Sequence, residues 1–300
     1  MNDARMRIPP VPSVALVLGA ALALTSCSGA CTSKPSIPFA TYGPEYQAKV
    51  DFARLEHEYP LTRADLLKLT PANLALFDQE QLDQIYARLT AGPIPDGPYR
   101  GTFFFSEGGG LKRAPEILGG LLGKAADVKV EFLEHLGGKL WQGKVFYRDK
   151  RELRNMISDR ISVDWLLKKL GVGEKELSPT RTPDGKDAWL LFPARLYCGQ
   201  SLLDGRRESI IIDYAFTDEM PGYQAGIDFL GGRNGTQIRD EIRMVRPGVY
   251  LGRAYLGKVF ALNFTLENET LAREQGDAFA KTGRIEEDCW PGSQRQIASN

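Results

Sequence analysis

The chain has 300 residues, of which 38 are basic and 38 acidic, so its formal net charge is zero. A general nucleic-acid-binding protein needs a basic excess to displace counterions from phosphates, and the neutral balance speaks against that class. Hydrophobic residues make up 43% of the chain and charged residues 25%, which is typical of a globular protein with a packed core. We therefore expect one large domain or two modest ones.

The N-terminus has the pattern of an export signal. Arg5 and Arg7 form a short positive region, and an uncharged apolar run follows from Val11 to Leu24. This run is shorter than the ~20 residues that a permanent membrane-spanning helix needs. We expect residues 1–26 to be removed as a leader.

The apolar run ends in Leu24-Thr25-Ser26-Cys27, which resembles the lipobox of bacterial lipoproteins. The resemblance implies cleavage before Cys27 and attachment of acyl chains, such as palmitate, to that cysteine. Two or three chains anchor a protein stably to a membrane, whereas one binds only marginally. Ser28 follows in place of Asp, which favours the outer membrane, with the protein facing the periplasm. The alternatives are an ordinary secretory signal or an uncleaved anchor.

Helical spacing predominates in the first part of the mature chain. Apolar residues predict one helix from Pro44 to Tyr59, a short helix capped by Thr62, and another from Pro71 to Leu89. Strand-like segments follow and are joined mostly by short turns, which favours antiparallel neighbours. They fall at 99–106, 141–148, 188–198, 209–217, 224–229, 236–245, 249–256 and 258–266, with helices expected at 115–136 and 162–171.

These patterns predict an α+β fold, in which about eight strands form an antiparallel β-barrel or half-barrel with an N-terminal helical hairpin and flanking helices. We expect a leader at 1–26, a flexible tether at 27–43, the hairpin at 44–92, the barrel domain with inserted helices at 93–266 and a C-terminal tail at 267–300.

Three short blocks lie within the predicted strands: Trp141-Gln142-Gly143-Lys144-Val145-Phe146, Ile238-Arg239-Asp240-Glu241-Ile242-Arg243 and Pro247-Gly248-Val249-Tyr250-Leu251-Gly252. Together they resemble uncharacterised bacterial proteins with a lipocalin-like barrel, over about residues 95–266 of this chain. The resemblance implies the barrel fold, and it brings no activity with it.

Motifs for metal and cofactor chemistry do not occur in the sequence. The chain has two histidines, and it contains no CxxC, HxH or HExxH spacing. It also lacks the G-x-S-x-G turn of a serine hydrolase and the glycine and Ser/Thr positions of a phosphate-binding loop. We therefore expect no metal and no cofactor.

Acidic and aromatic polar residues lie within the apolar strands. Asp240 shares the strand face of Ile238 and Ile242, so we expect it to point inward, while the opposite face with Arg239, Glu241 and Arg243 is expected to face solvent. A buried carboxylate needs a partner. The candidate partners of Asp240 are Arg195, Arg253, Tyr250 and Tyr214. Together with Asp213 and Asp240 itself, these residues are the candidates for a ligand-binding or catalytic site. An Asp–Arg pair that only fixes strand register is the alternative.

The remaining cysteines belong to an oxidising compartment if the leader directs export. A bridge between Cys198 and Cys289 would fasten the C-terminal tail to a strand, and free thiols are the alternative.

Three functions fit these observations. The favoured one is a lipid-anchored protein that binds a small apolar or amphiphilic ligand in its barrel. The second is an enzyme on the same barrel, with an inward Asp acting beside a Tyr or Arg. The third is an envelope assembly or interaction protein that uses the helical hairpin for docking.

Overall fold

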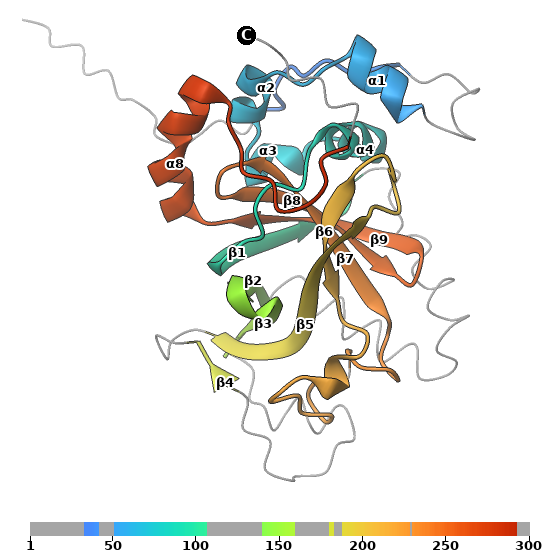
Figure 1. Ribbon diagram of the computed structural model, residues 1–300, viewed down its shortest axis with the longest axis vertical. Coiled ribbons are helices and arrows are strands. Elements are labelled where there is room, and N and C mark those ends of the chain that lie inside the picture. The colour runs from blue at the N-terminus through green and yellow to red at the C-terminus, as the bar shows by residue number, and fades with distance from the viewer. Residues whose placement is uncertain are drawn as a thin grey trace, which may run out of the picture. The chain divides into compact units, whose positions relative to one another are not determined.

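The computed structural model describes residues 33–41, 51–106, 140–159, 180–182, 188–228 and 230–292 (Figure 1). All of the described residues belong to one compact unit, within Ser33–Asn300. The predicted leader and Cys27 lie outside the described residues, and so do the helices expected at 115–136 and 162–171.

Four short helices precede the barrel: α1 (Phe52–Glu58), α2 (Arg63–Lys68), α3 (Pro71–Leu74) and α4 (Gln79–Arg88). Thr62 caps α2, as the sequence predicts, and Thr70 caps α3. The single helix expected from Pro71 to Leu89 is divided into α3 and α4, because the Asp78 side chain accepts a hydrogen bond from the Gln81 backbone N–H and begins a new helix. None of the helices described is long and apolar enough to cross a membrane.

Eight antiparallel strands form a closed barrel, which confirms the predicted fold class. In sheet order they are β3, β2, β1, β9, β8, β7, β6 and β5, and pairing of β3 with β5 closes the ring. The bounds are β1 (Gly97–Phe104), β2 (Trp141–Tyr147), β3 (Glu152–Ser158), β5 (Ala188–Gln200), β6 (Glu208–Asp213), β7 (Ile238–Arg246), β8 (Val249–Leu256) and β9 (Val259–Glu267). A two-residue strand, β4 (Thr180–Arg181), adds to β5, and short 3-10 helices lie at Arg148–Lys150 and Thr217–Glu219.

The identity of one strand differs from the prediction. Residues 224–229 were expected to form a strand, but those described there form turns, in which the Asp228 carboxylate accepts hydrogen bonds from the backbone N–H groups of Gln224 and Phe192. A side chain that bonds backbone in this way favours a turn over a sheet ladder. Its place in the barrel is taken by β3, which lies between β2 and β5.

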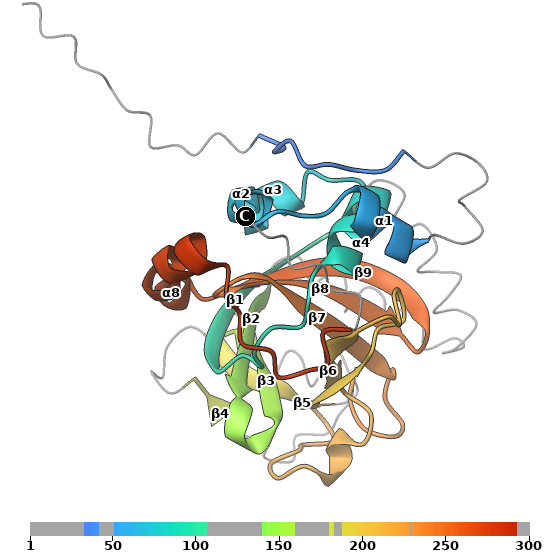
Figure 2. The same ribbon diagram turned by 45° about the horizontal axis from the view of Figure 1, so that its top comes forward.

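The helices cover part of the outer face of the barrel (Figure 2). Leu74, Ile85 and Leu89 pack there against Val245 and Leu251, in an apolar cluster separate from the core inside the barrel. The predicted tether contributes as well, because Ile37 is buried in the same cluster and Gln84 of α4 exchanges two hydrogen bonds with the backbone of Ala40.

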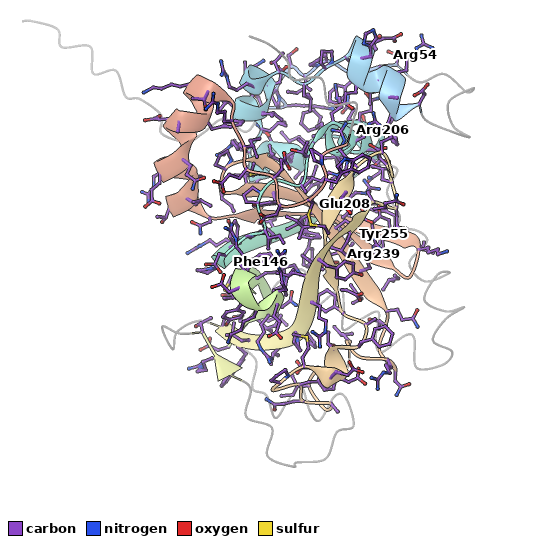
Figure 3. The ribbon with its side chains drawn as sticks, in the orientation of Figure 1. Arg54, Phe146, Arg206, Glu208, Arg239 and Tyr255 are labelled. Carbon is purple, nitrogen blue, oxygen red and sulfur yellow. A yellow bond between two sulfur atoms is a disulfide. The ribbon has the colours of Figure 1, made fainter. Side chains whose placement is uncertain are left out.

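Arg243 lies beneath this cover, where it donates a hydrogen bond to the Tyr86 carbonyl oxygen of α4, and the prediction that the face of Arg239, Glu241 and Arg243 meets solvent is wrong. Arg243 and Glu241 are fully buried, and Arg239 is partly so. The Arg243 guanidinium donates to Ser209 Oγ and to three backbone carbonyl oxygens. Arg206, labelled in Figure 3, and Arg207 pair with Glu56 of α1. The strand pattern gives the face correctly, but only the tertiary packing shows that another layer covers it.

The chain after β9 forms helix α8 (Glu269–Thr282) and then a strap, residues 285–292, that lies against the barrel (Figure 2). Asp288 accepts a hydrogen bond from the Ile94 backbone N–H, and Glu287 accepts one from that of Gly92. Cys289 is joined to Cys198 of β5 by a disulfide bond. The tail is therefore attached to the end of the barrel at which β1 and β6 begin.

Candidate functional site

The two ends of the barrel differ in how far their inward-facing side chains are buried. At the end covered by the strap, Tyr99, Phe146 and Tyr250 are buried, and Tyr250 donates a hydrogen bond to the Pro93 carbonyl oxygen at 2.6 Å. At the other end, apolar side chains that pack on the same core are only partly buried: Phe103, Leu140, Trp141, Trp189, Ile238, Ala254 and Leu262. We call these seven residues the apolar rim.

Two glycines make room for aromatic rings at this end. The Trp141 ring lies against Gly101 on β1, where an added Cβ would be 2.2 Å from a ring carbon. Phe264 lies against Gly252, its register partner on β8, with the same 2.2 Å approach. The rings of Trp141 and Phe264 meet edge to face, with their centroids 6.0 Å apart. Glycine is needed at both positions because a ring occupies the space of the side chain.

Beside these rings lies a buried polar group, which we call the Lys144 cluster: Lys144, Asn155, Tyr214 and Asp240. The Lys144 ammonium donates to Asn155 Oδ1 at 2.9 Å, to the Tyr214 hydroxyl at 2.6 Å and to Asp240 Oδ2 at 3.0 Å. These three bonds use its full donor capacity. Its Nζ also lies 5.4 Å from the centre of the Trp141 ring, within cation–π range.

Asn155 connects the Lys144 cluster to the surrounding backbone. Its Oδ1 also accepts from Trp141 Nε1 at 2.9 Å, and its Nδ2 donates to the Phe192 carbonyl oxygen at 2.9 Å. Phe192 has a left-handed backbone with φ of 50°, and the Asp228 carboxylate accepts from its N–H at 2.6 Å. Asp228 therefore holds the bend of β5 that presents the carbonyl to Asn155.

Burial and charge act in opposite directions on the titrating members of the Lys144 cluster. Burial would lower the pKa of Lys144, but Tyr214 and Asp240 outweigh it, and the pKa is raised. Burial raises the pKa of Tyr214 and that of Asp240. The Lys144 ammonium lowers both pKa values, but the effect of burial is larger. At neutral pH, Lys144 is thus an ammonium and Tyr214 a neutral phenol. Lys144 is therefore not a nucleophilic amine at this pH, and Tyr214 is not a phenolate base. Both serve as fixed hydrogen-bonding partners.

The structure brings together two of the six candidate residues from the sequence. Asp240 points inward, and the Tyr214 hydroxyl donates towards its Oδ2 at 3.5 Å. Tyr250 also lies inside the barrel, but at the end covered by the strap.

The other three candidates lie apart from the Lys144 cluster. Asp213 accepts a hydrogen bond from Tyr197 at 2.8 Å, and its register partner Arg195 is exposed. Arg253 is on the outer face, where it pairs with Asp83 of α4. Of the partners expected for Asp240, an arginine or a tyrosine hydroxyl, the Tyr214 hydroxyl lies beside it, whereas neither arginine does, and the pairing cation is Lys144.

The sequence pattern does not predict Lys144, Asn155 or Asp228 as site residues. The strand pattern does carry a signal for Lys144, since it stands two residues before Phe146 and so shares the inward face of β2. No such signal exists for Asn155, because the sequence pattern does not predict β3 as a strand. Asp228 acts through backbone contacts between distant segments, which no local pattern predicts.

No family model matches the chain, and no curated protein matches it either. Among solved structures, a crystal structure of a protein from Thermomonospora curvata is similar at 18% sequence identity. The match covers 64% of this chain and 88% of that chain, with a TM-score of 0.33, and it supports no functional inference.

Proposed function

We propose that this protein is a lipid-anchored protein of the bacterial cell envelope that binds a small amphiphilic molecule at the apolar rim. The observation that carries the proposal is the combination of partly exposed, inward-facing apolar side chains with a buried polar cluster beside them. Binding sites for such ligands pair apolar walls with a few placed polar groups. The lipid anchor at Cys27 would hold the barrel near the membrane, where amphiphiles are concentrated.

Asp240 is the residue that we assign to the polar end of the ligand. Its Oδ2 accepts from Lys144 and Tyr214, while the described residues supply no hydrogen bond to its Oδ1. A hydroxyl or amide hydrogen of the ligand could bond to that oxygen, while the apolar part contacts Trp141, Phe103 and Leu262. In the alternative, an enzyme with the inward Asp240 as its acid or base, Lys144 and Tyr214 would act only as hydrogen-bonding partners, because the pKa of each is shifted away from neutrality.

Photo-crosslinking in the host membrane tests the ligand part of the proposal. Cells that make the full chain are given a fatty acid bearing a diazirine and an alkyne, and are irradiated before purification and peptide mapping. We expect crosslinks in peptides that contain Trp141 or Leu262, and their loss in Leu262→Asp, which places a charge in the apolar rim. The same substitution at Leu67, an exposed residue of α2, should leave them unchanged. Label confined to the peptide of Cys27 would contradict ligand binding.

The anchor is tested separately. Replacement of Cys27 by serine should abolish incorporation of radiolabelled palmitate and release the protein from the membrane fraction. If the Cys27→Ser chain still incorporated palmitate and stayed in the membrane fraction, the lipoprotein assignment would be contradicted. That result would not bear on ligand binding.

A further inference from the structure

Three residues with metal-binding side chains meet where the strap joins the barrel. Cys198 lies near the end of β5, Glu208 begins β6, and Cys289 belongs to the strap. Their two sulfur atoms and a carboxylate oxygen all lie within 4.8 Å of one another. Figure 3 shows Glu208 beside the disulfide bond. The two cysteines are bonded, so this site can bind a metal only after reduction.

The surroundings hold the glutamate in place. Glu208 Oε2 accepts a hydrogen bond from the Trp290 backbone N–H at 2.8 Å, and the Glu208 N–H donates to the Trp290 carbonyl oxygen at 3.0 Å. A ligating carboxylate is commonly oriented by such a second contact. The Asp288 carbonyl oxygen, 3.3 Å from Cys198 Sγ, is a further oxygen close to the sulfurs.

Two thiolates and one carboxylate form a ligand set that suits Zn²⁺. Tetrahedral Zn²⁺ with bonds of about 2.3 Å to sulfur keeps two sulfurs roughly 3.7 Å apart. Because the Cα atoms of Cys198 and Cys289 are 5.3 Å apart, rotation about the side-chain bonds can produce that separation once the disulfide is reduced.

We propose that Cys198, Cys289 and Glu208 form a redox-controlled site for a thiophilic divalent cation such as Zn²⁺. A dithiol reductant transfers two electrons and two protons to the disulfide, which becomes two thiols, while the reductant becomes a disulfide. The cation then displaces one proton from each thiol and binds both sulfurs and the carboxylate. The cation keeps the strap attached to β5 and β6 when the covalent bond is absent.

Cobalt binding tests the proposal on the full chain in non-ionic detergent. Cys27→Ser and Cys31→Ser are present throughout, so that only Cys198 and Cys289 supply thiols. After reduction with a phosphine under argon, we expect one equivalent of Co²⁺ to produce a thiolate-to-metal charge-transfer band, which Zn²⁺ abolishes. The oxidised chain, which is identical in sequence, should give no such band.

Substitutions define the ligands. Glu208→Gln keeps both thiols and should weaken Co²⁺ binding by about tenfold or more. Glu286→Gln, an exposed change on the same strap, should leave it unchanged. Cys289→Ser should abolish the band, and circular dichroism of the reduced chain and of each variant confirms that the fold persists. Equal Co²⁺ affinity of the reduced and oxidised chains would overturn the proposal, as would an unchanged affinity of Glu208→Gln.

Discussion

Lys144 and Asp240 form a buried ion pair whose members come from strands far apart in sequence. Removal of two charges from water costs several kcal/mol per ion, and their attraction offsets this cost only when further hydrogen bonds complete the geometry. Asn155 and Tyr214 supply those bonds. The pair as a whole should therefore add little net stability compared with apolar side chains of similar volume.

Replacement of Lys144 alone should be costly. Lys144→Met leaves the Asp240 carboxylate buried and unpaired, and we expect the free energy of unfolding to fall by about 3–5 kcal/mol in urea denaturation. The double variant Lys144→Met/Asp240→Leu should recover most of that loss, because no buried charge remains. Arg195→Met, on the exposed face of β5, should change stability by less than about 0.5 kcal/mol. A double variant as unstable as the single one would contradict this account.

Buried tyrosines should make the fold sensitive to alkali. Burial raises the pKa of Tyr99 from 10.0 to about 12, and it also raises that of Tyr250. A group whose folded pKa is higher contributes stability that is complete below its unfolded pKa and is lost as pH rises towards the folded value. We expect Tyr99 to account for a loss of about 1 kcal/mol between pH 9 and 11, measured by urea unfolding. Tyr99→Phe should show a shallower decline, and an equal decline would contradict the assignment.

Among the elements, strands with clean alternation could be predicted from the sequence. β7 alternates Ile238, Asp240 and Ile242 with charged residues, and its bounds are close to the expected ones. β3 was missed because Met156 and Ile157 are adjacent apolar residues and a register shift interrupts its pairing with β5. The strands of the fold were thus largely predictable, whereas the contacts of the Lys144 cluster across the barrel were not. Alternation indicates which way a side chain points, but it does not indicate what it meets.

The contact between Gly252 and Phe264 gives a test at the level of paired strands. An added methyl group at Gly252 would collide with the Phe264 ring, so Gly252→Ala should cost about 1–3 kcal/mol in the free energy of unfolding. Gly276→Ala in α8 is the matched control. Nothing lies within 4 Å of the added Cβ there, and helix propensity should stabilise the protein by up to about 1 kcal/mol. Similar effects of the two substitutions would contradict the packing role of Gly252.

For the whole molecule, the disulfide restricts the unfolded chain over a long loop. Cys198 and Cys289 are 91 positions apart, and loop-closure entropy for such a length corresponds to about 4–5 kcal/mol. Reduction in the presence of a metal chelator should lower the free energy of unfolding by up to that amount, with urea denaturation as the measurement. Cys198→Ala/Cys289→Ala, measured without reductant, should give the same decrease. No difference between the oxidised and reduced chains would contradict this role.

The pairing of β1 with β9 has a consequence for the order in which the protein can fold. β1 spans residues 97–104 and β9 residues 259–267, yet they are neighbours in the barrel. The ring therefore cannot close until nearly the whole chain is available, and such distant pairing is slow because it must overcome the entropy of a long loop. If the chain is exported from its N-terminus, it remains open during most of its passage, and barrel closure becomes a late event on the far side of the membrane.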